Sequence, residues 1–225
     1  NWGSSSIDYN TSATSFSSYN CSSIEITGNS KPVKKSSDGS DMYYGTNMDL
    51  KLYNAGYTVD SSGNRIPMNV RIHGESSKGF VFNTSGGYAS IRGAAAYTGK
   101  TPSKGYNVIE LYFYFYDARN NNSLSVNGVM QMVDIDTNEG YVLRNGATNV
   151  YLTSGSNIFL GTLGTTTKYW LAKTNDDTNG IDRNHAMQIT YSSTPSSPLH
   201  IGYYCEKKNS TRGMSFTQEG ISVNY

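Results

Sequence analysis

The sequence has little cysteine, proline, tryptophan or charge, and it has no long apolar run. Its 225 residues include 2 Cys, 5 Pro and 2 Trp, and 16% of them are charged. A bilayer-spanning helix needs about 18 consecutive apolar residues, and no stretch approaches that length, so membrane insertion is not expected. Lys and Arg total 18 against 17 Asp and Glu, without a recurring basic stripe, which argues against a nucleic-acid partner.

The two cysteines, Cys21 and Cys205, lie near opposite ends of the chain. Neither has a second Cys or a His at metal-ligand spacing, which excludes a structural zinc site at these positions. A disulfide between them would close nearly the whole chain, stabilise it by about 4–5 kcal/mol and require an oxidising compartment. We expect this disulfide, with two buried thiols as the alternative.

Short segments of alternating polar and apolar residues fill most of the chain, separated by Gly, Ser, Asn and Asp. This pattern predicts strands joined by tight turns. The expected strands are 23–27, 49–53, 67–73, 78–83, 89–92, 106–118, 128–135, 140–143, 149–152, 157–160, 168–172, 185–192, 199–204, 214–216 and 221–223. The prediction is an all-β fold, a two-sheet antiparallel β-sandwich of jelly-roll or lectin-like type with little or no helix. Residues 1–22 are expected to form a loose N-terminal lead-in packed on the domain, and residues 23–225 a single β-sandwich domain.

The strongest predicted strand, 106–118, alternates apolar and phenolic side chains. Ile109, Leu111, Phe113 and Phe115 fall on one face, which is expected to enter the core. Tyrosines fall on the other face, where their rigid amphipathic rings suit a binding surface. The candidate ligand-binding residues are Tyr112, Tyr114, Tyr116 and Trp170. In the alternative interpretation these rings pack beneath loops or between the sheets.

Two acidic loops offer oxygen ligands for a metal ion, and calcium is the candidate ion. The first loop places Asp134, Asp136 and Asn138 at alternating positions, as in the first half of a calcium loop. The second offers Asp177, Asn179 and Asp182 around a glycine turn. The alternatives are an acidic turn whose carboxylates accept backbone N–H groups and an ordinary Asn-Gly hairpin turn. The three histidines, at 73, 185 and 200, are expected to be plain strand residues.

The first acidic loop is also similar to the E-x-D-x-x-E motif of retaining jelly-roll glycoside hydrolases. In that motif, alternating carboxylates on one strand act as nucleophile and acid. Here the three positions are Asp134, Asp136 and Glu139, so an Asp stands where the nucleophilic Glu is expected. Two tryptophans are also few for a cleft that stacks sugar rings. We therefore expect no enzyme, with the hydrolase as an alternative.

Residues 106–143, YNVIELYFYFYDARNNNSLSVNGVMQMVDIDTNEGYVL, combine the aromatic strand, a hairpin and the acidic turn. This combination resembles ligand-binding regions of cell-wall-anchored adhesins of Gram-positive bacteria, including the streptococcal fibrillar and antigen I/II types. The resemblance implies a secreted module, attached to the cell wall through regions outside this chain. It also implies that the module binds a host or microbial glycan or an extracellular matrix protein without catalysis. A structural spacer domain is a second alternative.

Overall fold

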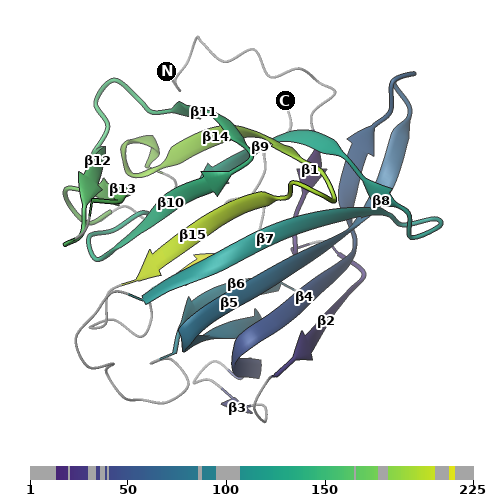
Figure 1. Ribbon diagram of the computed structural model, residues 1–225, viewed down its shortest axis with the longest axis horizontal. Coiled ribbons are helices and arrows are strands. Elements are labelled where there is room, and N and C mark those ends of the chain that lie inside the picture. The colour runs from purple at the N-terminus through teal and green to yellow at the C-terminus, as the bar shows by residue number, and fades with distance from the viewer. Residues whose placement is uncertain are drawn as a thin grey trace.

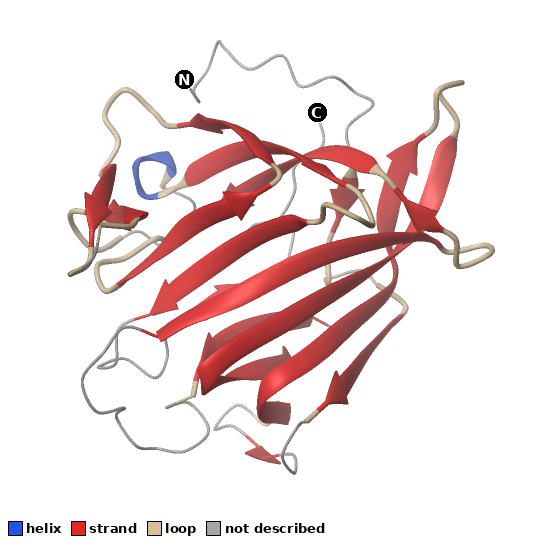
Figure 2. Ribbon diagram, in the orientation of Figure 1, coloured by secondary structure: helices blue, strands red, loops and turns tan. Residues whose placement is uncertain are grey.

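The computed structural model describes residues 14–19, 21–29, 34–35, 39, 41–85, 88–94, 107–164, 166–176, 182–205 and 213–215. The strands are β1 (Ser15–Phe16), β2 (Ser23–Gly28), β3 (Lys34–Lys35), β4 (Asp41–Val59), β5 (Arg65–Ser85), β6 (Tyr88–Gly93), β7 (Asn107–Asp117), β8 (Ser123–Leu124), β9 (Val126–Met132), β10 (Glu139–Asn145), β11 (Ala147–Tyr151), β12 (Ile158–Thr162), β13 (Lys168–Ala172), β14 (Met187–Ser193), β15 (Leu199–Cys205) and β16 (Gly213–Ser215). One 3-10 turn, η1 (Arg183–His185), is the only helical element in these ranges (Figure 2). Within the described ranges, no helix is both long enough and apolar enough to span a membrane.

The strands form two sheets, in which all the strand pairs are antiparallel (Figure 1). The 13-stranded sheet runs in the order β1-β4-β5-β7-β15-β10-β13-β12, and β2, β3, β6, β8 and β16 pair at its margins. The three-stranded sheet has the order β11-β14-β9. The prediction of an all-β, two-sheet antiparallel fold with little helix is therefore confirmed, although the predicted strand 221–223 lies outside the described residues.

The core lies between the inner faces of the two sheets. The apolar face of β7, formed by Ile109, Leu111, Phe113 and Phe115, is at most 2% exposed, as its alternation predicted. Phe115 stacks on Tyr191 of β14 with ring centroids 6.2 Å apart, which joins the larger sheet to the smaller one. Face-to-face packing of this kind defines a sandwich.

The β4–β5 hairpin is much longer than the sequence indicates. The predicted strands 67–73 and 78–83 are confirmed as strand, but the predicted reversal between them is wrong, because β5 continues through both. Residues 68–75 of β5 pair with β7, whereas residues 80–85 pair with β6, so the strand changes its partner along its length within the larger sheet. Gly74 lies beside this change, and the ring of Phe80 packs over it so closely that a Cβ there would lie 2.7 Å from the ring. Figure 1 draws β6 behind β5.

Part of the predicted N-terminal lead-in forms a strand. Ser15 and Phe16 pair with Tyr57 and Gly56 of β4, and Phe16 is buried against Phe115. Gly56 is required here because a Cβ would lie 1.9 Å from the Ser15 carbonyl oxygen. The division of the chain into 1–22 and 23–225 stays a prediction.

The opposite margin of the larger sheet is formed by β12. In the described part of the chain this strand pairs with β13 alone. Its sequence, Ile158–Thr162 (IFLGT), contains neither charge nor proline. Phe159 and Leu160 are 37% and 46% exposed, so this edge presents apolar side chains to solvent.

The predicted Cys21–Cys205 disulfide is wrong, because both cysteines are free thiols. The Cys21 thiol donates to the carbonyl of Ser18, whose hydroxyl accepts from the N–H of Ala89 on β6. The Cys205 sulfur lies beside Gly93, at the other end of β6. Ala89 and Gly93 are four strand residues apart, which corresponds to about 13 Å. A disulfide needs Cα atoms less than about 7 Å apart, and the groups that the two cysteines contact lie at opposite ends of β6.

Thiol titration tests whether Cys21 and Cys205 are free. Unfolded, unreduced protein is expected to show two reactive thiols. In the folded protein Cys205 is expected to be unreactive, because its side chain is buried and burial raises the pKa of its thiol to about 12. The absence of reactive thiols in the unfolded protein would restore the disulfide.

Candidate functional site

The outer face of β7 carries the predicted phenol ladder. Tyr112, Tyr114 and Tyr116 alternate with the buried apolar residues and are half-buried, so their rings stand on the solvent side of the sheet. The neighbouring strands β5 and β15 flank this face. The alternation of β7 thus keeps three aromatic rings out of the core.

Tyr112 is engaged with a histidine from β15. Its ring stacks on His200 with centroids 3.9 Å apart and an interplanar angle of 19°. The His200 Nε2 lies 2.9 Å from Glu110, which also accepts from Arg144. Burial raises the pKa of Tyr112 and lowers that of His200. Tyr112 is therefore fixed in a stacked and charged cluster.

Tyr114 and Tyr116 share a different partner, Arg71 of β5. The Arg71 guanidinium lies 4.1 Å from the Tyr114 ring centroid, within cation–π distance. Its Nε donates to the Tyr116 hydroxyl at 3.1 Å, and its Nη1 donates to Asp49 at 3.2 Å. One guanidinium, itself held by a carboxylate, thus fixes the positions of both rings.

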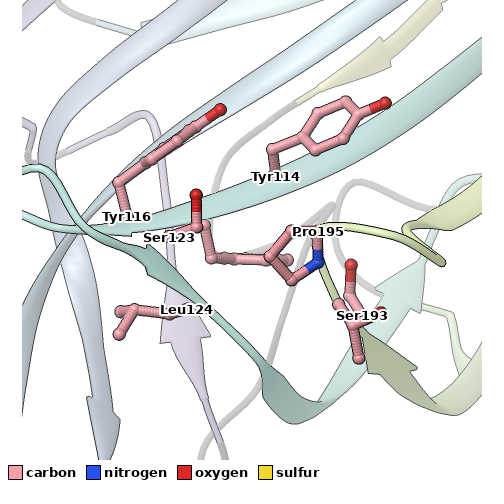
Figure 3. Close-up of a pocket in the computed structure, with 8 residues that line it drawn as sticks. Tyr114, Tyr116, Ser123, Leu124, Ser193 and Pro195 are labelled. Atoms are coloured by element: carbon pink, nitrogen blue, oxygen red, sulfur yellow. The ribbon is translucent and has the colours of Figure 1, made fainter.

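A shallow hollow of about 10 Å³, the space of about one water molecule, lies beside these two tyrosines (Figure 3). Its walls come from β7, from β8 and from the connection between β14 and β15. The lining residues are Tyr114, Phe115, Tyr116, Ser123, Leu124, Ser193, Thr194 and Pro195. In Figure 3 the Tyr114 and Tyr116 side chains stand beside Ser123 and Pro195. The hollow is smaller than the roughly 300–1,000 Å³ of pockets that enclose drug-sized ligands.

Trp170, the fourth predicted binding residue, lies away from this hollow. It is on β13, where it pairs with Tyr141 of β10 and Leu160 of β12. Two strands, β15 and β10, separate β13 from β7 in the sheet. The structure brings Tyr114 and Tyr116 together at one hollow but does not bring Trp170 to them.

The two predicted acidic loops lie against each other. The Asp136 carboxylate accepts from the backbone N–H of Asp176 at 2.6 Å. The Asn175 side-chain oxygen accepts from the backbone N–H and the hydroxyl of Thr137, at 3.0 and 2.6 Å. Segments about 40 residues apart in sequence therefore form one polar region.

A group formed by Asp176, Asp182 and His185 in this region can hold a metal ion, because their ligand atoms lie within 4.8 Å of one another. The His185 Nδ1 lies 3.0 Å from Asp182, and its Nε2 lies 2.9 Å from the Thr174 hydroxyl. The backbone N–H of Asn184, followed by His185, lowers the pKa of Asp182. His185 was expected to be a plain strand residue, but it ends η1.

The other predicted metal ligands are placed differently. Asp134 is exposed and, like Asn138, has a positive φ, of 53° and 71° respectively. Neither belongs to the group that contains Asp182. Asp177 and Asn179 lie outside the described residues. Sequence reasoning missed His185 and Asp176, although the D-x-x-H spacing of Asp182 and His185 is visible in the sequence.

The hydrolase motif does not have the geometry that its chemistry needs. Asp134 and Asp136 lie in the connection between β9 and β10, so they do not alternate along a strand. Glu139 is 4% exposed and accepts from the Tyr203 hydroxyl at 2.5 Å and from the backbone N–H of Asp136 at 2.9 Å. A carboxylate buried in these bonds is a structural acceptor and is poorly placed to reach a substrate.

Comparison with known proteins identifies the fold. No protein-family model matches the chain, and no curated protein sequence matches it. Among solved structures, the chain is similar to the N-terminal domain of the Streptococcus gordonii adhesin Sgo0707, with a TM-score of 0.55 and 12% identity. The match covers 96% of this chain and 64% of that one, so the chain spans less than two thirds of that structure. The resemblance to streptococcal adhesins is thereby confirmed at the level of the fold.

Proposed function

We propose that this chain is an adhesin module that binds an extracellular ligand through the outer face of β7 without catalysis. The similarity of its fold to an adhesin domain supports this role. It also supports a location at the cell surface, with attachment to the cell wall through regions outside this chain. The ligand is a host or microbial glycan or an extracellular matrix protein.

The proposal depends on the half-buried rings of Tyr114 and Tyr116 on the outer face of β7. The sheet leaves these rings half-exposed, and Arg71 fixes them before any ligand arrives. Rings held in place lose little conformational entropy on binding, which is a property of good binding sites. A structural spacer has no need of aromatic groups that are held in position at its surface.

Arrays of glycans and matrix proteins test this function. The immobilised chain is expected to retain a ligand, and mass spectrometry is expected to recover that ligand unchanged. A cleaved glycan, with cleavage lost in Asp134→Asn or Glu139→Gln, would establish the hydrolase instead. No retention on either type of array would contradict the adhesin and favour the spacer.

We propose further that the group formed by Asp176, Asp182 and His185 binds calcium. The carboxylates of Asp176, Asp182 and the adjacent Asp136 are hard oxygen ligands, which calcium prefers. The imidazole of His185 is the one ligand in this group that would favour zinc over calcium. A bound ion would brace the two acidic loops against each other.

Chelation is expected to lower the melting temperature, and added calcium is expected to restore it. An ion present at 100 times its Kd stabilises a fold by about 2.7 kcal/mol. Asp182→Asn is expected to abolish the response to EDTA, whereas Asp134→Asn, at an exposed position outside the group, is expected to keep it. Restoration by zinc alone would reassign the ion, and an unchanged melt in EDTA would remove the site.

A further inference from the structure

We infer that β12 forms an antiparallel pair with β12 of a second copy of this chain, so that two larger sheets join edge to edge. This interface is separate from the β7 face and adds to the proposed function. Three features of β12 favour a second copy as its partner: a free backbone side, a lack of charge and a self-complementary sequence.

One side of β12 carries backbone groups that can bond to another strand. The N–H of Lys173 donates to the carbonyl of Asn157 at 2.9 Å, which fixes the side of β12 that faces β13. Because antiparallel bonding alternates along a strand, the N–H and C=O groups of Ile158 and Leu160 point away from β13. The Ile158 N–H agrees with this direction, since it donates to the Ser156 hydroxyl at 2.9 Å. Within the described ranges no strand pairs with this side.

The segment that contains β12 has no charged side chain. Residues 146–167 include no Asp, Glu, Lys, Arg or His. In an antiparallel pair of identical strands, a charge near the two-fold axis lies opposite or next to its own copy, which destabilises the pair. Two copies of β12 have no such cost. A charged foreign strand would gain no ion pair here, so the edge favours an uncharged strand such as its own.

The sequence IFLGT is complementary to itself when Leu160 lies on the two-fold axis. The N–H of each Leu160 then donates to the Leu160 carbonyl of the other copy, and each Thr162 N–H donates to the other Ile158 carbonyl. Phe159 lies opposite Gly161 of the second copy, at a position where cross-strand side chains approach most closely. Gly161 has no side chain, so the large ring has room.

The pair would cover apolar side chains that a single copy exposes. Phe159 and Leu160 are 37% and 46% exposed, and apart from Tyr19 they are the only large exposed apolar side chains in the described part of the chain. Half-buried Trp170 lies opposite Leu160 on β13 and continues this apolar surface. Burial of such surface drives association. A strand of 5 residues buries little area, so we expect a weak dimer, with a Kd between about 1 µM and 1 mM.

Sedimentation velocity of the whole chain, from about 10 µM to about 1 mM, tests this interface. The mass of the wild-type chain is expected to rise with concentration towards that of a dimer. Leu160→Lys and Leu160→Glu are each expected to weaken dimerisation about tenfold or more, because each places like charges opposite each other at the two-fold axis. An equimolar mixture of the two variants is expected to associate again, since Lys then lies opposite Glu.

Asn149→Lys is the matched control. It adds the same charge at an exposed position of β11, which is also an uncharged edge strand, and it is expected to leave dimerisation unchanged. Circular dichroism melts show whether each variant is folded. If a charged variant melts early, Thr162→Pro replaces it, because proline removes an N–H on the free side of β12 without adding charge.

The possible outcomes are distinct. Dimerisation that is lost in each Leu160 variant, recovered in their mixture and kept in Asn149→Lys supports the β12 pair. A wild-type chain that stays monomeric up to about 1 mM overturns it, and so does a dimer that survives Leu160→Lys. Loss without recovery in the mixture overturns the register centred on Leu160. An equal loss in Asn149→Lys would attribute the effect to net charge and would also overturn the inference.

Discussion

Raising the pH above about 10 is expected to unfold the protein steeply. Burial raises the pKa values of Tyr141, Tyr191 and Tyr203 above the ordinary tyrosine value of 10.0. Below pH 10 these phenols are neutral in both the folded and the unfolded chain, so their contribution to stability is complete. Above pH 10 the unfolded chain releases protons that the folded chain retains, and the free energy of unfolding falls.

The free energy of unfolding is expected to fall steeply with pH in this range. Each retained proton lowers the free energy of unfolding by about 1.4 kcal/mol per pH unit, so three tyrosines together lower it by about 4 kcal/mol per pH unit. Urea titrations between pH 9 and pH 11 measure this slope. Tyr191→Phe is expected to remove about a third of it, and an identical slope in that variant would contradict the assignment.

Tyr191→Phe also tests the contribution of this hydroxyl to stability at neutral pH. The buried Tyr191 hydroxyl has no hydrogen-bond partner among the described residues, so its removal is expected to leave stability unchanged or slightly higher. Tyr203→Phe is the matched comparison, because it removes a hydroxyl that donates to buried Glu139. That loss is expected to cost about 1–3 kcal/mol.

Gly56→Ala is expected to lower the free energy of unfolding by about 3 kcal/mol or more, approaching the cost of removing a buried Phe side chain. The new Cβ would lie 1.9 Å from the Ser15 oxygen and 2.7 Å from the Phe16 Cα, both of them backbone atoms. Strand β1 must therefore move away from β4. Phe16, which is 1% exposed, would then leave its place against Phe115.

Gly155→Ala provides the control for this substitution. Gly155 is exposed, and the nearest atom to its added Cβ lies 3.7 Å away. A surface change of this kind is expected to alter stability by at most about 0.5 kcal/mol. Equal effects at Gly56 and Gly155 in chemical denaturation would show that β1 contributes little.

The parts of the fold that were predictable depend on local periodicity. The alternation of β7 is written in consecutive residues, so both its buried face and its phenol face follow from the sequence. The length of β5 does not, because the polar residues between Gly74 and Gly79 have the composition of a turn. In the folded chain they are part of strand β5, and the ring of Phe80 packs over Gly74, a contact that the composition does not indicate.

The candidate sites show the same division. Tyr114 and Tyr116 could be identified from the sequence, but Pro195, which completes the hollow, comes from a connection nearly 80 residues further along the chain. Both acidic loops could be recognised separately, whereas their contact through Asp136 and Asp176 is a product of the tertiary fold. The disulfide prediction failed for the same reason, since sequence spacing does not show how far apart two distant cysteines lie in the fold.

The uncharged edge formed by β12 affects how the protein behaves at high concentration. Natural sheet edges usually carry lysine, proline or a bulge, which prevents another chain from adding a strand. Ile158–Thr162 lacks lysine and proline and exposes Phe159 and Leu160. Self-association through this edge would raise apparent avidity without any change at the tyrosine hollow. Leu160→Lys would protect the edge and make measured affinities those of the single module.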